Sequence, residues 1–196
     1  MNKYVDNTVG RLNQKQLSLI YGSLLGDGYM RIIEGRCNAF LEINHSFKAK
    51  KYVDWKFNIL KNICISSPKE RVTNKGRIAY RFFTRQSDEL TKIYNLFYKN
   101  KKKVIPKSLV LDPMLLAVWY MDDGSKCSTS NIYLNTQQFS MKDQKFLLHL
   151  LRKIGVKARL NKDKKYYRIR ILAESIKTFM NIIKNNIEDS MRYKLV

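Results

Sequence analysis

Two stretches of the sequence decide the fold: LSLIYGSLLGDGYM at residues 17–30 and MLLAVWYMDDGSK at residues 114–126. Each is an apolar run with helical spacing that ends in an aspartate followed by a glycine. The two aspartates, Asp27 and Asp123, lie about half of the 196-residue chain apart. A pattern that recurs at half the chain length predicts an internal duplication.

The segments that follow each run correspond in order and type. Two strand-like segments come first, then a helical segment, a second strand pair and a closing helix. In the first half these are residues 29–33, 39–46, 48–63, 69–84 with a turn near 74–76, and 87–99. In the second half they are residues 125–130, 131–138, 141–155, 156–172 with a turn near 161–163, and 174–186. The pattern predicts an α+β fold of two αββαββα units related by a pseudo-twofold axis.

This duplication sets the expected domain boundaries. Residues 1–12 are expected to form an N-terminal arm, 13–103 the first half, 104–111 a linker, and 112–196 the second half. The second half is expected to begin at Asp112-Pro113, because proline suits the first position of a helix.

The charge of the chain favours nucleic acid as its partner. Lys and Arg number 38 against 16 Asp and Glu, which gives a net charge of +22. Basic side chains gain affinity for nucleic acid by releasing the counterions of its phosphates. No apolar run approaches the roughly 18 residues of a membrane span, and no signal peptide is evident. We therefore expect the protein to act in the compartment of its gene, either an organelle (mitochondrion or chloroplast) or a bacterial cytoplasm.

Few residues are available for a metal site of soft ligands. The chain has three cysteines without CxxC spacing and only two histidines. A zinc site or disulfide framework is thus disfavoured. Any catalytic metal must be held mainly by oxygen, which favours Mg²⁺ or Mn²⁺.

The spacing of two glycines predicts how the halves meet. Gly22 and Gly26 lie four apart on one helix face, which suggests close approach of another backbone. The natural partner is the equivalent helix of the second half, whose matching face carries Val118 and Asp122. Tight crossing would bring the helix C-termini together, each with partial negative charge and an aspartate. A divalent cation would relieve the repulsion between these groups.

The two aspartate-glycine motifs resemble those of a known protein family. The two copies of the motif of LAGLIDADG homing endonucleases resemble LIYGSLLGDG and LAVWYMDDG in this chain. The monomeric two-motif group of that family, typified by the mitochondrial omega-intron endonuclease, is similar to this chain in the segments WYMDDGSK and NLFYKNKKKVIPKSL. The resemblance implies a monomer whose two antiparallel sheets form a saddle on double-stranded DNA. It also implies intron homing: metal-dependent cleavage of both strands at a long asymmetric site, leaving short 3′ overhangs.

The resemblance carries roles onto individual residues. It implies that Asp27 and Asp123 hold the metals, while Gly26 and Asp122 lend backbone carbonyls. It implies Mg²⁺ as the cofactor, with Mn²⁺ or Ca²⁺ able to substitute in binding. Further catalytic positions that match are Lys103, Lys194, His45 and Gln137, with Gln138 as a rival for Gln137. His45 departs from the glutamine that many relatives carry.

Strand alternation selects the side chains expected to face DNA. Arg and Lys suit guanine, Asn suits adenine, and other contacts reach only phosphate. In the first half the candidates are Tyr29, Arg31, Ile33, Phe40, Glu42, Asn44, Lys75, Arg77 and Arg81. In the second half they are Ser128, Asn131, Tyr133, Asn135, Arg159, Lys162, Arg168 and Arg170.

Three alternative functions remain open from the sequence. The first is an RNA-splicing maturase, with intron RNA as a partner. The second is a catalytically inactive DNA-binding protein on the same scaffold. The third, a structural RNA-binding protein, explains the charge but leaves the duplicated Asp-Gly helix ends unexplained.

Overall fold

The computed structural model describes residues 11–72, 76–128 and 131–195 of the chain. The elements of the first half are α1 (Gln14–Leu25), β1 (Tyr29–Ile32), β2 (Ala39–Ser46), α2 (Lys50–Leu60), β3 (Lys69–Val72), β4 (Ile78–Phe83) and α3 (Asp88–Phe97). Those of the second half are α4 (Pro113–Asp123), β7 (Gly124–Ser128), β8 (Asn131–Leu134), α5 (Met141–Lys153), β9 (Ala158–Asp163), β10 (Tyr166–Ile171) and α6 (Ala173–Ile183). The order αββαββα occurs twice, as the sequence predicts.

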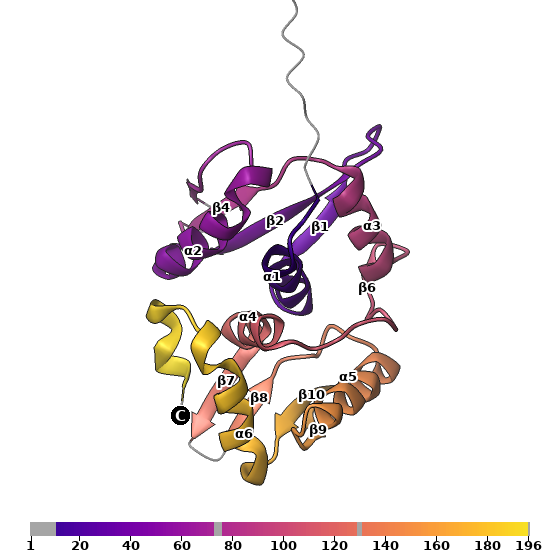
Figure 1. Ribbon diagram of the computed structural model, residues 1–196, viewed down its shortest axis with the longest axis vertical. Coiled ribbons are helices and arrows are strands. Elements are labelled where there is room, and N and C mark those ends of the chain that lie inside the picture. The colour runs from indigo at the N-terminus through magenta and orange to yellow at the C-terminus, as the bar shows by residue number, and fades with distance from the viewer. Residues whose placement is uncertain (1–10, 73–75, 129–130, 196) are drawn as a thin grey trace, which may run out of the picture.

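Each half is built on one antiparallel sheet of four strands. The strand orders are β1-β2-β4-β3 and β7-β8-β10-β9, so the topology is the same in both halves. Helices α2 and α3 contact the first sheet, and α5 contacts the second. Figure 1 shows the two halves on either side of α1 and α4, which lie next to each other at the centre. The predicted α+β fold with two antiparallel sheets is confirmed.

Short elements join and close the halves. A two-stranded hairpin of β5 (Tyr98–Lys99) and β6 (Lys102–Lys103) follows α3, and residues 104–112 contain no helix or strand. The described part of the chain contains four 3-10 segments: η1 (Phe47–Ala49), η2 (Lys61–Ile63), η3 (Lys184–Asn186) and η4 (Asp189–Lys194). Segment η4 contacts both α2 and β7, so the C-terminal segment of the second half reaches across to the first half.

Helices α1 and α4 begin at defined caps. Asn13 and Gln16 form a reciprocal capping box at α1. Asp112 caps α4 by accepting a hydrogen bond from the Leu115 amide, and Pro113 is the first residue of the helix, as expected. The hydroxyl of Ser18 also donates to Asp112 at 2.7 Å. The start of α4 is therefore tied to the middle of α1.

The predicted close approach at the two glycines is present. A β-carbon on Gly22 would lie 2.6 Å from the Leu115 carbonyl oxygen, and one on Gly26 would lie 2.4 Å from Cβ of Asp122. Both distances are too short for a real contact, so only glycine permits this helix crossing. The apolar side chains of α4 are buried almost completely from Met114 to Met121, because this helix packs between the two halves.

One predicted turn is wrong. The hairpin of the second half turns at Lys164-Lys165, with a positive φ of 54° at Lys164, and not at residues 161–163. Residues 158–163 all pair with β10, which carries the strand past the expected turn. The turn expected near residues 74–76 and the N-terminal arm fall largely outside the described residues. Within the described ranges, no helix has the length and apolar character to cross a bilayer.

Candidate active site and nucleic-acid interface

Asp27 and Asp123 occupy equivalent places at the ends of the central helices. Asp27 lies in the turn just beyond α1, and Asp123 is the last residue of α4. Both line one pocket, which also contains Tyr29, Asn135 and Lys103. The Asp27 side chain is 49% exposed, so the pocket is open to solvent. The crossing of α1 and α4 therefore brings the two carboxylates to a common, accessible site.

The electrostatics of this pocket disfavour two free carboxylates. The pKa of Asp123 is raised to about 7, mainly by burial and then by the charges of Asp27 and Asp122. The pKa of Asp27 is also raised, mainly by burial and then by Asp122. Raised carboxyl pKa values mean that the ionised forms are costly in the absence of a bound cation.

Both predicted lysines lie at the helix ends. Lys103 donates to the carbonyl oxygen of Gly26 at 2.8 Å, and Lys194 donates to the carbonyl oxygens of Met121 and Gly124 at 2.5 and 3.0 Å. Burial lowers the pKa of Lys103 to about 8 and lowers that of Lys194. Each half thus contributes one partly buried ammonium group at a helix end near the carboxylates.

His45 lies between two carboxylates. Its Nδ1 is 3.6 Å from Oδ2 of Asp27, and its Nε2 is 3.7 Å from Oδ1 of Asp122. Burial, followed by the charge of Lys56, lowers the pKa of His45 to about 4, so the imidazole is neutral at physiological pH.

The side chain of Asp122 has a role that the sequence reading did not include: it is fully buried in an ion pair with Lys56. The expected contact of its backbone carbonyl with a metal stays a prediction. Lys56 and its neighbour Tyr52 were not selected from the sequence. The only available signal is a lysine on the apolar side of α2, in a chain where lysine is common.

The two glutamines point to different partners. Gln137 donates to Asp163 at 2.8 Å, whereas Gln138 donates to the carbonyl oxygen of Leu25 at 3.3 Å. Both line the pocket of Asp27 and Asp123. Gln138 thus contacts the end of α1 and is the stronger candidate for a role at the centre, although Gln137 was preferred from the sequence.

The strand register separates the two faces of the first sheet. Tyr29 pairs with Glu42, Arg31 with Phe40, and Asn44 with Arg81, so these residues share the face opposite the helices. Ile33 and Arg77 are exposed just beyond β1 and before β4. Lys75 lies outside the described residues. Lys69 and Arg71 of β3 occupy the same face by their pairing with Arg81 and Ala79, and the sequence reading missed them.

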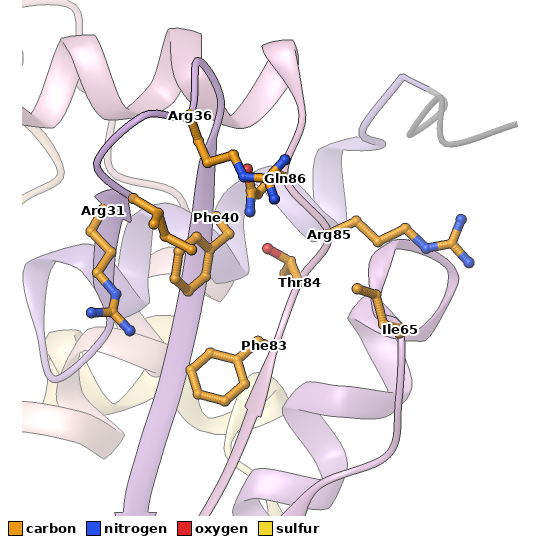
Figure 2. Close-up of a pocket in the computed structure, with 9 residues that line it drawn as sticks. Arg31, Arg36, Phe40, Ile65, Phe83, Thr84, Arg85 and Gln86 are labelled. Atoms are coloured by element: carbon orange, nitrogen blue, oxygen red, sulfur yellow. The ribbon is translucent and has the colours of Figure 1, made fainter. Parts of the chain in front are cut away.

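A pocket hollows the first sheet at its end remote from Asp27. Figure 2 shows the rings of Phe40 and Phe83 in this pocket, with Arg31 beside them. The Arg31 guanidinium lies 5.2 Å from the Phe40 ring centroid, and the two rings meet edge to face at 5.9 Å. Phe40 is 6% exposed, so it forms the floor of this face rather than a protruding contact.

The second sheet presents a basic face. Arg159 pairs with Arg170, and Asn161 with Arg168, so these four side chains point the same way, opposite Ile169 and Ile171. Arg168 stacks on Tyr133 with 3.9 Å to the ring centroid and donates to Asn135 at 3.4 Å. Ser128 and Asn131 lie at the bulged end of the β7–β8 pair.

Lys162 was predicted to face DNA, and this prediction is wrong. It pairs with Tyr167, in register with Leu160 and Ile169, and therefore belongs to the helix-side face. The misplaced turn caused this error, because alternation continues through residues 161–163. Asn161 takes the place on the open face that was assigned to Lys162.

The donor atoms of the central pocket fit a hard divalent cation. Two carboxylates with raised pKa values converge there, and the polar residues around them offer amide oxygens. Asp27, His45 and Asp122 also offer atoms within 4.8 Å of one another. However, both Asp122 oxygens already accept hydrogen bonds from Lys56. The pair of Asp27 and Asp123 is therefore the better metal site.

Comparisons with known proteins agree with this geometry. The model of the LAGLIDADG DNA endonuclease family matches residues 17–179. The cytochrome b mRNA maturase bI2 of Saccharomyces cerevisiae is 33% identical over 98% of this chain, which spans 50% of that protein's length. DNA endonuclease I-ChuI of Chlamydomonas applanata is 32% identical over 94% of this chain and 95% of its own. The structure of homing endonuclease I-WcaI bound to its DNA recognition sequence has a TM-score of 0.87, at 26% identity, covering 96% of this chain and 88% of that one.

Proposed function

Because the chain belongs to the LAGLIDADG DNA endonuclease family, we propose that it is a site-specific endonuclease that cleaves both strands of a long, asymmetric DNA site. One observation carries the proposal: Asp27 and Asp123 line a single open pocket together with Lys103, and Lys194 lies at the end of α4 next to Asp123. An inactive DNA-binding scaffold has no need of this arrangement, which keeps both carboxyl pKa values raised at a cost in stability.

The two sheet faces supply the DNA-binding surface of the proposed enzyme. Their open faces carry arginines from both halves, including Arg31, Arg81, Arg168 and Arg170. The faces differ in composition, since the first has the Phe40–Phe83 pair and the second has the Arg168–Tyr133 stack. A DNA site read by two unlike faces is asymmetric, and contacts from the basic side chains give binding that weakens steeply with salt.

The chain's own residues would act on the scissile phosphates as follows. Asp27 and Asp123 would hold divalent ions, with Mg²⁺ as the proposed physiological metal. Bound metal would activate water and stabilise the leaving oxygen. Lys103 and Lys194 would stabilise the negative charge that develops on the phosphates. Gln138 would keep the end of α1, and with it Asp27, in place through the Leu25 carbonyl.

A direct test uses random duplexes selected for binding and then exposed to Mg²⁺. The wild-type protein is expected to enrich an asymmetric site and cut both strands of it, with short 3′ overhangs. Asp27→Asn and Asp123→Asn are each expected to bind the same site and to lose double-strand cleavage of it, with residual nicking of the strand that depends less on the missing carboxylate. Equal behaviour of the wild type and both variants in Mg²⁺ would refute the nuclease proposal and leave a DNA-binding protein.

RNA splicing is a second candidate function. It is favoured by the similarity to the cytochrome b mRNA maturase bI2 over nearly the whole chain. The test is a splicing assay with purified protein and RNA transcribed from the DNA that flanks the gene. If Asp27→Asn abolishes DNA cleavage but leaves splicing intact, both functions reside on one scaffold.

A further inference from the structure

A buried ion pair joins the two halves beneath Asp27. Lys56 of α2 donates to both carboxylate oxygens of Asp122 at 2.8 and 2.9 Å, and also to Oγ of Ser23 at 3.1 Å. The hydroxyl of Tyr52 donates to Oδ1 of Asp122 at 2.8 Å. The side chains of Lys56 and Asp122 have no exposed area. Charges buried this completely are retained only where their geometry is well satisfied.

His45 connects this ion pair to Asp27. Its ring packs on Tyr52 with 5.4 Å between centroids, and its two nitrogens face Asp122 and Asp27 just beyond hydrogen-bond distance. The Nε2 atom is buried and has no hydrogen-bond partner among the described residues. A buried polar atom in this state calls for an explanation. A small shift of the ring would let Nε2–H donate to the Asp122 carboxylate that Lys56 holds. In the neutral imidazole this leaves Nδ1 without a proton, so in the metal-free protein Nδ1 can accept from the Asp27 carboxyl, whose pKa is raised.

The Asp123 side of the pocket is built differently. In the first half, the residue equivalent to Asp122 is Gly26, whose lack of a side chain admits Asp122 into the interface. The pocket that Asp123 shares with Asp27 is lined by the amides Asn135, Gln137 and Gln138 and by Lys103. The link through His45 to the buried Lys56–Asp122 pair reaches Asp27, whereas the side chains that line the pocket beside Asp123 are amides and an ammonium group.

We propose that the Lys56–Asp122 ion pair is a positioning device for Asp27: it fixes His45, which in turn orients the Asp27 carboxylate. The two strands of the DNA are then cut by unequal centres. Lys56, Asp122 and His45 are positioning residues here, since they act through Asp27. This inference rests on the proposed nuclease function and names the residues that differentiate its two halves.

The first test measures the cleavage of each strand separately. A duplex of the selected site carries a different label on each strand, and Asp27→Asn identifies the strand that depends more on Asp27. The double variant Lys56→Met/Asp122→Leu replaces the charges with apolar groups of similar size. It is expected to slow that strand at least fivefold more than the other, so that nicked DNA accumulates. Tyr52→Phe, which removes one hydrogen bond to Asp122, is expected to act in the same direction more weakly.

The controls separate positioning from a general structural effect. Lys92→Met disrupts an exposed ion pair with Asp88 and is expected to leave the strand ratio unchanged. If the double variant slows both strands equally, or neither, the proposal is wrong. It is also wrong if Asp27→Asn itself slows both strands equally, because the two centres are then not separable.

The second test needs no cleavage. In metal-free protein, the nitrogen NMR shifts of His45 report its tautomer and hydrogen bonding, with exposed His149 as the internal reference. The wild type is expected to show one dominant His45 tautomer, and the double variant a mixture. Identical His45 shifts in the two proteins would overturn the positioning role. If the wild type cuts neither strand, the nuclease proposal fails, and this measurement alone decides whether Lys56 and Asp122 position His45.

Discussion

Nζ of Lys56 lies 2.8 Å from Oδ1 of Asp122, across the interface of the two halves, and neither side chain is exposed to solvent. Removal of the lysine alone leaves a carboxylate buried without its counter-charge. We therefore expect Lys56→Met to lower the free energy of unfolding by about 3–5 kcal/mol, measured by urea denaturation. A wild-type unfolding midpoint in this variant would contradict the role of the ion pair.

Two control variants show whether the loss of stability in Lys56→Met comes from the unpaired buried charge. The double variant Lys56→Met/Asp122→Leu removes both charges and is expected to recover most of the stability, since apolar replacements of buried pairs are often neutral. Lys92→Met breaks an ion pair whose side chains are 70% and 74% exposed, and is expected to change stability by less than about 1 kcal/mol.

The crossing of α1 and α4 gives a second prediction. A methyl group at Gly26 would lie 2.4 Å from Cβ of Asp122, and neither helix backbone can move without disturbing the core. Gly26→Ala is expected to destabilise the protein by roughly 1–3 kcal/mol through overpacking. Thermal unfolding measures the effect, and an increase in Tm would show that the interface is looser than described.

The sequence predicts the fold because its signals are local and occur twice. The acid-glycine ends of α1 and α4, the strand pairs and the proline at the start of α4 each indicate one element, and the duplication relates them. The hairpin turn at Lys164-Lys165 was missed because neither residue is a typical turn former. That error displaced Lys162 to the wrong face, since alternation depends on where a strand ends.

The candidate site is only partly visible in the sequence. Asp27, Asp123, Lys103 and Lys194 stand out through their motifs, and the structure brings them together at the two helix ends. The partnership of Lys56 with Asp122 joins residues 66 positions apart on different halves, and no local pattern marks it. Long-range ion pairs of this kind depend on the packing of whole elements, so they emerge only from the folded chain.

Lys103 gives a third prediction, about catalysis. Its ammonium donates to the Gly26 carbonyl beside the carboxylates, and burial lowers its pKa to about 8. Lys103→Met is expected to slow DNA cleavage by roughly 10²–10³-fold, the loss typical for one group that stabilises transition-state charge. Single-turnover cleavage in Mg²⁺ measures the rate. Lys102→Met, at the exposed neighbouring position, is the matched control, and equal losses in the two variants would assign the effect to charge alone.

Arg168 gives a fourth prediction, about DNA binding. It stacks on Tyr133, which holds its guanidinium on the open face of the second sheet, the face proposed to bind DNA. Arg168→Ala is expected to weaken binding and, if the residue contacts phosphate, to reduce the salt slope by about one. Titrations at several salt concentrations measure both quantities. Arg152→Ala, at an exposed position of α5, removes the same charge away from this face. An equal loss of affinity in both variants would mean that net charge alone drives binding.

The fifth prediction concerns pH and Mg²⁺. In the metal-free fold the pKa of Asp123 is raised from its ordinary value of 3.8 to about 7, mainly by burial and then by the charge of Asp27. Between these values the folded protein binds a proton that the unfolded chain has released. The stabilisation from this proton is fully present below pH 3.8 and is lost as the pH rises through about 7. Asp123→Asn lacks this proton, so its stability relative to the wild type should be greater at pH 8 than at pH 5.

Added Mg²⁺ binds the ionised carboxylates, so it should stabilise the wild type more at pH 8 than at pH 5 and have little effect on Asp123→Asn. Urea denaturation at constant ionic strength, with EDTA or with Mg²⁺, measures both differences. Parallel stability curves for the two proteins from pH 5 to 8 would mean that the carboxylates do not meet as described.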